Sequence, residues 1–217
     1  IRAVYGGSYG DGNCGVSSII VNGGSCGEIY GGGYCLNTEN AKGNHTGVAN
    51  IVINNTDSKI SIYGGGQNAS VGQSDIRINN GLVQDVTAGG SKSLTSVGRV
   101  NIKNGVIDMI QSTCNGSVGF ADIYILGGSV GTLYAGAEPT SDNDGSFGCA
   151  GLHILNGKVN TLATGYNNSS EYIAEKVVSG EYKAGVIKNE TDALKLFKLT
   201  KIESVNNGDG EYPVISF

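Results

Sequence analysis

Three charged residues recur at one position of neighbouring sequence segments and could form an acid–base–acid row. Asp75, Arg99 and Asp122 each stand three residues before the isoleucine that ends a short apolar stretch. Glycosidases need two carboxyl groups roughly 5–10 Å apart, and carboxylates on alternate coils would lie near the upper end of that range. Arg99 would stand between them and neutralise both. We therefore interpret the row as a surface charge ladder, with a polysaccharide-cleaving site as the alternative.

Four tyrosines share a second repeated position, namely Tyr5, Tyr30, Tyr63 and Tyr134. Because side chains alternate between the faces of a strand, we expect this position to face solvent, with the first three rings about 4.8 Å apart on adjacent strands. Such a ladder stabilises neighbouring strands. We interpret the ladder in this way; the alternatives are an interface with another subunit or domain and a platform for sugar rings.

The five cysteines have no common position. Cys14 and Cys35 follow glycine runs in adjacent segments, and stacking would bring them within the 4.4–6.8 Å Cα separation of a disulfide. We predict that bond, which would favour an extracellular setting. Cys26 and Cys149 stand in apolar columns and are predicted to be buried thiols. Cys114 is left over on a loop.

No set of residues has the spacing of a metal or cofactor site. His45 and His153 are isolated in the sequence, without a carboxylate at metal-binding spacing, and they form neither a zinc site nor a catalytic triad. We expect no metal and no cofactor.

These residues are positioned by an internal repeat of about 24 residues. Each copy has a short apolar strand, an Asn/Gly turn, a second apolar strand and a run of small residues. The copies span 19–33, 51–66, 76–90, 100–113, 123–136 and 152–165, with a partial copy at 3–7. The last apolar residue of each first strand serves as the anchor: Val21, Ile53, Ile78, Ile102, Ile125 and Ile154.

Apolar residues fill the columns two before, five after and eight after the anchor, and the alternation of strands directs them to one side. One unit buries about five apolar side chains, worth roughly 8–15 kcal/mol. Ordering its backbone costs on the order of 24–48 kcal/mol. A unit therefore cannot fold alone, and neighbours must stack. We predict an all-β parallel β-helix, or β-solenoid, of about seven coils over residues 1–170, with right-handed winding favoured.

The composition changes near residue 171, after which charged residues are frequent and glycine is rare. We predict a small α+β C-terminal cap over 171–217, made of a last partial coil (176–186), a short helix (189–199) and a β-hairpin (201–217). A cap would cover the exposed core and strand edges of the solenoid end. The alternative is a contact surface for another subunit. The N-terminus opens in the middle of a coil, which indicates that other coils or another chain complete that end.

Composition excludes several classes of protein. The 217 residues include 37 glycines but only 2 prolines, which excludes collagen. The net charge of −5 argues against a nucleic-acid partner, and no apolar run is long enough to span a membrane.

The repeated NGG-x-V-x-x-V-Y-G-G-G theme over residues 1 to about 170 resembles the Gly-rich β-solenoid repeats of bacterial surface adhesins and phage appendage proteins. The resemblance implies a shaft or presentation surface and transfers no catalytic residue. We therefore expect a non-enzymatic structural or adhesive segment of an extracellular or virion fibre, which associates with itself or with neighbouring fibre domains. The alternative is a β-helix protein that binds or processes polysaccharide, with a glycan as its partner.

Overall fold

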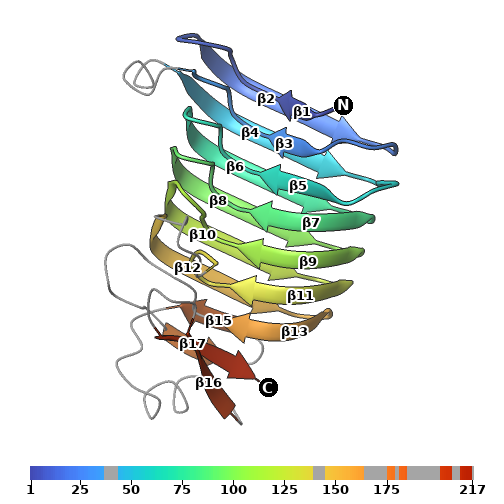
Figure 1. Ribbon diagram of the computed structural model, residues 1–217, viewed down its shortest axis with the longest axis vertical. Helices are drawn as coiled ribbons and strands as arrows, with labels where there is room; N and C mark the ends of the chain where they lie inside the picture. Colours follow the sequence, from blue (N-terminus) through green and yellow to red (C-terminus); the bar gives the residue numbers. More distant parts are fainter. Residues whose placement is uncertain are drawn as a thin grey trace.

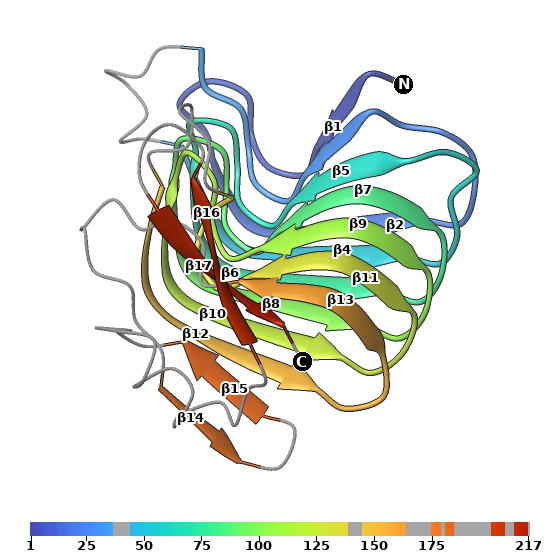
Figure 2. The same cartoon turned by 60° about the horizontal axis from the view of Figure 1, so that its bottom comes forward.

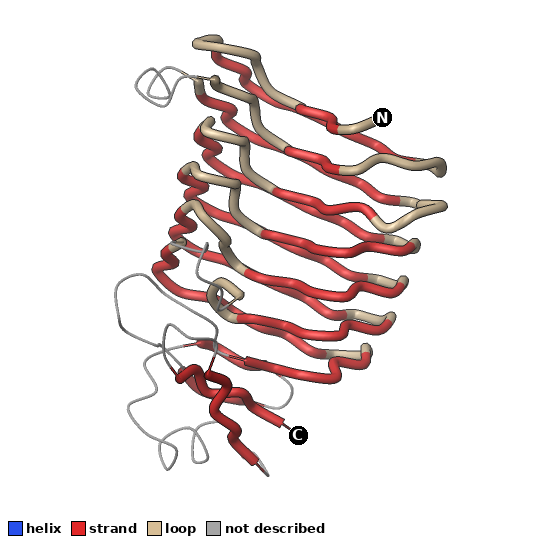
Figure 3. Tube along the Cα trace, viewed as in Figure 1, coloured by secondary structure: helices blue, strands red, loops and turns tan. Residues whose placement is uncertain are grey.

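A computed structural model describes residues 1–36, 44–138, 145–163, 175–178, 181–184, 201–206 and 211–216. Their regular structure consists of strands, and the described part of the chain contains no helix (Figure 3). The chain winds into a parallel β-solenoid whose coils follow one another along the long axis of the molecule (Figure 1). The predicted fold class is confirmed.

Each coil combines one nine-residue strand with one shorter strand. Six such coils follow the opening strand β1 (Ala3–Tyr5), against the prediction of about seven, which counted the partial copy. In chain order they are β2 (Asn13–Val21) with β3 (Glu28–Tyr30), β4 (His45–Ile53) with β5 (Ile60–Tyr63), β6 (Ser70–Ile78) with β7 (Leu82–Thr87), β8 (Leu94–Ile102) with β9 (Val106–Gln111), β10 (Ser117–Ile125) with β11 (Ser129–Tyr134), and β12 (Ser146–Ile154) with β13 (Lys158–Ala163).

The long and the short strands form separate parallel sheets on either side of the coil interior (Figure 2). The long strands pair in the order β2, β4, β6, β8, β10 and β12, and the short strands in the order β1, β3, β5, β7, β9, β11 and β13. A third line of parallel bridges runs through Tyr9, Tyr34, Gln67 and Ser91, just after each glycine run. From Tyr9 to Ser91, neighbouring coils are therefore bonded along three lines.

Isoleucine dominates the core between the two sheets. The largest fully buried side chains are all isoleucines: Ile29, Ile51, Ile53, Ile60, Ile62, Ile76, Ile78, Ile102, Ile107, Ile110, Ile123 and Ile125. β-Branched side chains suit a strand because their restricted χ1 costs little there and they pack well on a pleated surface. The predicted inward columns are the ones that form this core.

The turn between the two strands of a coil depends on glycine and asparagine. Gly24, Gly81, Gly105 and Gly128 stand three residues after the anchor and have positive φ, whereas Gly157 in the same column does not. Asparagines beside these glycines form hydrogen-bonded ladders from coil to coil. One ladder joins Asn22, Asn54 and Asn79 at 2.7 Å per step, and a second joins Asn55, Asn80 and Asn104 at 3.4 and 3.3 Å.

The C-terminal strands pair differently from the solenoid. β14 (Glu175–Val178) pairs antiparallel with β15 (Glu181–Ala184), and β15 pairs antiparallel with β12, where a further coil would have added a parallel strand. β16 (Lys201–Asn206) and β17 (Glu211–Ser216) pair antiparallel, as a hairpin requires, and β17 lies antiparallel against β13. The predicted helix at 189–199 lies outside the described residues, so the cap as a whole stays a prediction.

Candidate functional site

The tyrosine column forms the stacked ladder that the repeat predicts. Tyr5, Tyr30 and Tyr63 are in register on β1, β3 and β5. The ring centroids of Tyr5 and Tyr30 lie 4.9 Å apart with 9° between the planes, and those of Tyr30 and Tyr63 lie 4.6 Å apart with 7°. Further along the shaft the column continues through Thr87, Gln111, Tyr134 and Ala163. The strand spacing therefore sets the spacing of the rings.

The prediction that this column faces solvent is wrong for its central members. Tyr30 is only 3% exposed, and Thr87 and Gln111 are buried. Although the column points away from the core, the chain turns sharply at the glycines that follow each tyrosine and brings the next residues against it. The Tyr34 ring lies 5.2 Å from that of Tyr5, and the Tyr5 hydroxyl donates to Gln67 Oε1 at 2.6 Å.

The tyrosines on both sides of this turn form one cluster, which we call the aromatic corner: Tyr5, Tyr9, Tyr30, Tyr34 and Tyr63. Tyr9 and Tyr34 contact each other with ring centroids 5.6 Å apart and 37° between the planes. Sequence reasoning missed these two residues. The signal was present in the spacing Tyr-Gly-Gly-x-Tyr, which occurs at 5–9 and again at 30–34.

Burial changes the titration of groups along this column. Desolvation raises the pKa of Tyr5, Tyr30 and Tyr63 above the ordinary tyrosine value, and neighbouring negative charge adds to the effect. Desolvation also raises the pKa of Asp85 and of Glu138. These five groups are therefore partly sheltered from water although they lie outside the core.

A buried asparagine holds the loop that carries Tyr9. The Asn44 side-chain amide donates to the carbonyl oxygens of Ser8 at 3.0 Å, Gly10 at 2.6 Å and Tyr34 at 3.3 Å. Asn44 is fully buried, so these contacts are shielded from competing water. No repeated signal marks Asn44 in the sequence.

The charge ladder is in register, but its carboxylates have other partners than predicted. Asp75, Arg99 and Asp122 occupy equivalent positions on β6, β8 and β10. Arg77 donates to Asp75 at 2.6 Å, and His153 Nε2 lies 2.9 Å from Asp122 Oδ1. The prediction that Arg99 neutralises both acids is therefore wrong. Each carboxylate is engaged on its own, which does not favour a pair acting together on one glycosidic bond.

His153 is less isolated than the sequence indicates. Besides its contact with Asp122, its ring stacks on Tyr124, with centroids 4.1 Å apart and 4° between the planes. Gly151 leaves room for this arrangement, because a Cβ there would lie 3.0 Å from Asp122 Oδ1 and 3.2 Å from His153 Nε2. The cluster joins β10 to β12 on the outward face of the long-strand sheet.

The predicted disulfide is absent from the structure. Cys14 is a free thiol whose Sγ lies 3.3 Å from the Val16 carbonyl oxygen, and its register partner is Thr46. Tyr34 pairs with Tyr9, so Cys35 comes directly after this pair. Cys14 stands several residues further along its coil and is therefore not opposite Cys35. The glycine runs are in register, but the two cysteines stand at different distances behind them.

The other thiols separate into inward and outward columns. Cys26 is partly buried and packs against the core, as predicted. The column assigned to Cys149 faces outward, and its first member, Val16, is 66% exposed; the side chain of Cys149 lies outside the described part. Cys114 lies on a loop between β9 and β10, as predicted, and is buried there.

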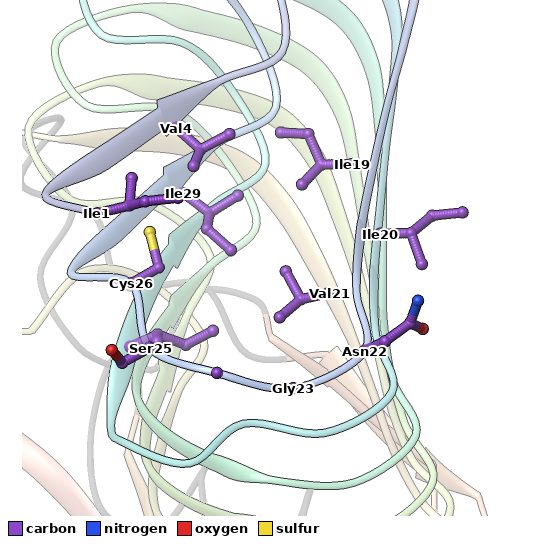
Figure 4. A pocket seen from close by; sticks show the side chains of 12 residues that line it. Ile1, Val4, Ile19, Ile20, Val21, Asn22, Gly23, Ser25, Cys26 and Ile29 are labelled. Atoms are coloured by element: carbon purple, nitrogen blue, oxygen red, sulfur yellow. The ribbon is translucent and has the colours of Figure 1, made fainter.

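At the first coil the core opens into a cavity of about 270 Å³. Val4, Cys26 and Ile29 face Ile19 and Val21 across it (Figure 4). These positions belong to columns that the following coils fill with buried side chains. The cavity is therefore the end of the hydrophobic core rather than a pocket built around polar groups.

The described residues contain no cluster of three or more side chains suited to a metal ion. Within the same ranges, no helix is long and apolar enough to cross a membrane. Comparison with known proteins finds no matching family model, curated protein or solved structure.

Proposed function

We propose that the protein is a non-enzymatic structural and adhesive segment of an extracellular or virion fibre, in which the solenoid is the shaft. One observation carries the proposal: the column eight after the anchor stays in register over seven successive strands, through Val4, Ile29, Ile62, Val86, Ile110, Leu133 and Leu162. Coils that share a core and bond on several sides resist bending, as a shaft must.

The outward face of the long-strand sheet supports self-association. Val16 and Ile20 on β2 are 66% and 61% exposed, and they lie next to Val48 and Val52 on β4. Val48 and Val52 are half-buried, so the four side chains form one apolar patch that is most exposed at β2. Contiguous apolar patches on a surface are typical of interaction sites. A second copy is the partner that we infer.

An enzymatic role has less support. A glycosidase or lyase needs carboxyl groups that act together on one substrate. Asp75 and Asp122, the pair that the sequence offers, are two strands apart and engaged by Arg77 and His153.

Light scattering over a concentration series, with negative-stain images of the same sample, tests the proposal. We expect a mass that is a multiple of the chain mass, or rods longer than roughly 35 Å, the length of the seven stacked short strands at about 4.8 Å each. Ile20→Lys should lower the associated fraction because it places a charge in the apolar surface. Val106→Lys is the matched control, since Val106 is also exposed but lies on the short-strand sheet. A compact monomer at every concentration would overturn the proposal.

A further inference from the structure

The aromatic corner presents aromatic surface to solvent. Tyr9 is 71% exposed and Tyr34 is half-buried, and their rings meet at an angle of 37°. The Tyr5 ring continues this surface, tilted by 44° against Tyr34. Tyrosine is enriched at binding interfaces because its ring offers a large apolar face and its hydroxyl group can still form a hydrogen bond.

Hydrogen bonds between coils hold the backbone below these rings. Tyr9 and Tyr34 form a parallel bridge, Tyr34 N–H donates to the Ser8 carbonyl at 3.0 Å, and Gly10 N–H donates to the Tyr34 carbonyl at 2.9 Å. The buried Asn44 amide adds three further contacts to the same carbonyl groups and to that of Gly10. The backbone that carries the rings is therefore ordered before a ligand binds, which lowers the conformational entropy lost on binding.

The chemical groups of the aromatic corner limit the classes of ligand that it can bind. On the side that faces the second coil, the backbone N–H and C=O groups of the corner are already bonded between coils. The opposite side of β1 is the open edge of the short-strand sheet, and an extended peptide would pair with that edge rather than with the ring faces. A nucleic acid would bring phosphates to a chain with a net charge of −5. The remaining recognition elements are flat ring faces, tyrosine hydroxyls and the Gln67 amide.

Those elements fit a sugar ring. One face of a pyranose carries C–H groups that pack on an aromatic ring, while its hydroxyl groups exchange hydrogen bonds with phenol and amide groups at the edge. We propose that Tyr9 and Tyr34 are the platform of a binding site for a neutral oligosaccharide, with Tyr5 and Gln67 at its edge. The inference deepens the adhesive part of the proposed function and rests on it.

Binding of the full chain to immobilised neutral hexose oligosaccharides of four to six units, such as glucans, mannans and galactans, tests this site. Titration calorimetry with the soluble form of any retained oligosaccharide then measures the affinity. We expect Tyr9→Ala to weaken binding at least about tenfold, because the sugar face loses its most exposed platform. Tyr9→Phe should bind nearly as well as the wild type, since the ring face remains.

Tyr134→Ala is the matched control, because Tyr134 belongs to the same column but lies on β11, far along the shaft. It should bind like the wild type. Retention of no neutral oligosaccharide, or equal affinity of Tyr9→Ala and wild type, would overturn the inference. A drop in particle mass for Tyr9→Ala without sugar binding would assign the corner to self-association instead. Because the fibre proposal is judged by mass and rod length, each can fail without the other.

Discussion

Tyr30 stacks face to face on Tyr63 at 4.6 Å, and the same ring stacks on Tyr5 with its opposite face. Tyr30 is therefore covered on both faces although it points away from the hydrophobic core. The ladder links three successive strands of one sheet outside the core. It adds side-chain contacts between coils that the isoleucine columns do not supply.

We expect Tyr30→Ala to lower the free energy of unfolding by about 3–5 kcal/mol, as truncation of a buried aromatic residue does. The variant loses both stacked contacts and opens a void between Tyr5 and Tyr63. Urea unfolding followed by circular dichroism measures the change. Tyr9→Ala is the control, because the Tyr9 ring is largely exposed. Its removal should lower the free energy of unfolding by less than about 1 kcal/mol. Equal losses for the two variants would mean that the ladder does not stabilise the fold.

Alkaline pH should destabilise the protein through the same ladder. Burial holds the pKa of Tyr30 and Tyr63 above the ordinary value near 10. As pH rises above that value, the unfolded chain releases protons that the folded chain still binds, so the free energy of unfolding falls. Urea midpoints measured between about pH 8 and 11 should show this decline.

The double variant Tyr30→Phe with Tyr63→Phe should flatten the alkaline decline, because it removes both hydroxyl groups and keeps both rings. Tyr9→Phe serves as its control and should leave the slope almost unchanged. A double variant as pH-sensitive as the wild type would assign the decline to other groups.

The architecture could be predicted because the repeat constrains it at every coil. The second copy shows this. The register places Ile62 in the same column as Ile29 and Val86, although the pairing has an irregularity between Ile60 and Ser61. Stacked coils place like residues together, so a column found in the sequence is a column in the structure.

Which residues share a column could be predicted more easily than whether that column is buried or exposed. Alternation tells on which side of a strand Tyr30 lies, but not that the glycine turn brings Tyr34 and its neighbours against the ladder. The column of Val16 was expected to be buried because its residues are apolar, but it faces outward. The role of Asn44 could not be predicted from the sequence, because it depends on hydrogen bonds to three carbonyl groups that come together only in the fold.

Asp85→Asn should stabilise the protein at neutral pH. Desolvation raises the pKa of the Asp85 carboxyl, and the charge of Asp108 raises it further, against the hydrogen bond from Ser61 and the charge of Lys59. Because the pKa of Asp85 is higher in the folded than in the unfolded chain, protonated Asp85 stabilises the folded state. That stabilisation is lost as pH rises through the folded-state pKa. The gain from Asp85→Asn should therefore be present at neutral pH and shrink on acidification.

Thermal unfolding of Asp85→Asn and wild type at a series of pH values from about 3 to 7 measures this difference. Asp11→Asn is the control, since Asp11 is exposed. A destabilised Asp85→Asn at neutral pH would show that the Ser61 hydrogen bond, 3.2 Å long, outweighs the cost of burial.

Gly81, in the turn of the third coil, has no room for a side chain. Its φ is +126°, and a Cβ there would lie 2.7 Å from Thr56 Oγ1 and 2.9 Å from Thr56 N. That hydroxyl accepts from Leu82 N–H and donates to the Leu82 carbonyl, both at 2.8 Å, and so joins the second coil to the third. Gly81→Ala should lower the free energy of unfolding by about 1–3 kcal/mol from backbone strain alone, with a further loss if Thr56 is displaced.

Gly23→Ala is the matched control for Gly81→Ala, because Gly23 lies in the corresponding turn of the first coil with nothing within 4 Å of its Cβ position and no positive φ. It should change stability by less than about 0.5 kcal/mol in the same urea titration. Thr56→Val separates the two causes, since it removes the hydrogen bonds to Leu82 and leaves Gly81 intact. If Thr56→Val is as destabilising as Gly81→Ala, the intercoil hydrogen bonds determine the cost; if it is nearly neutral, the strained backbone does.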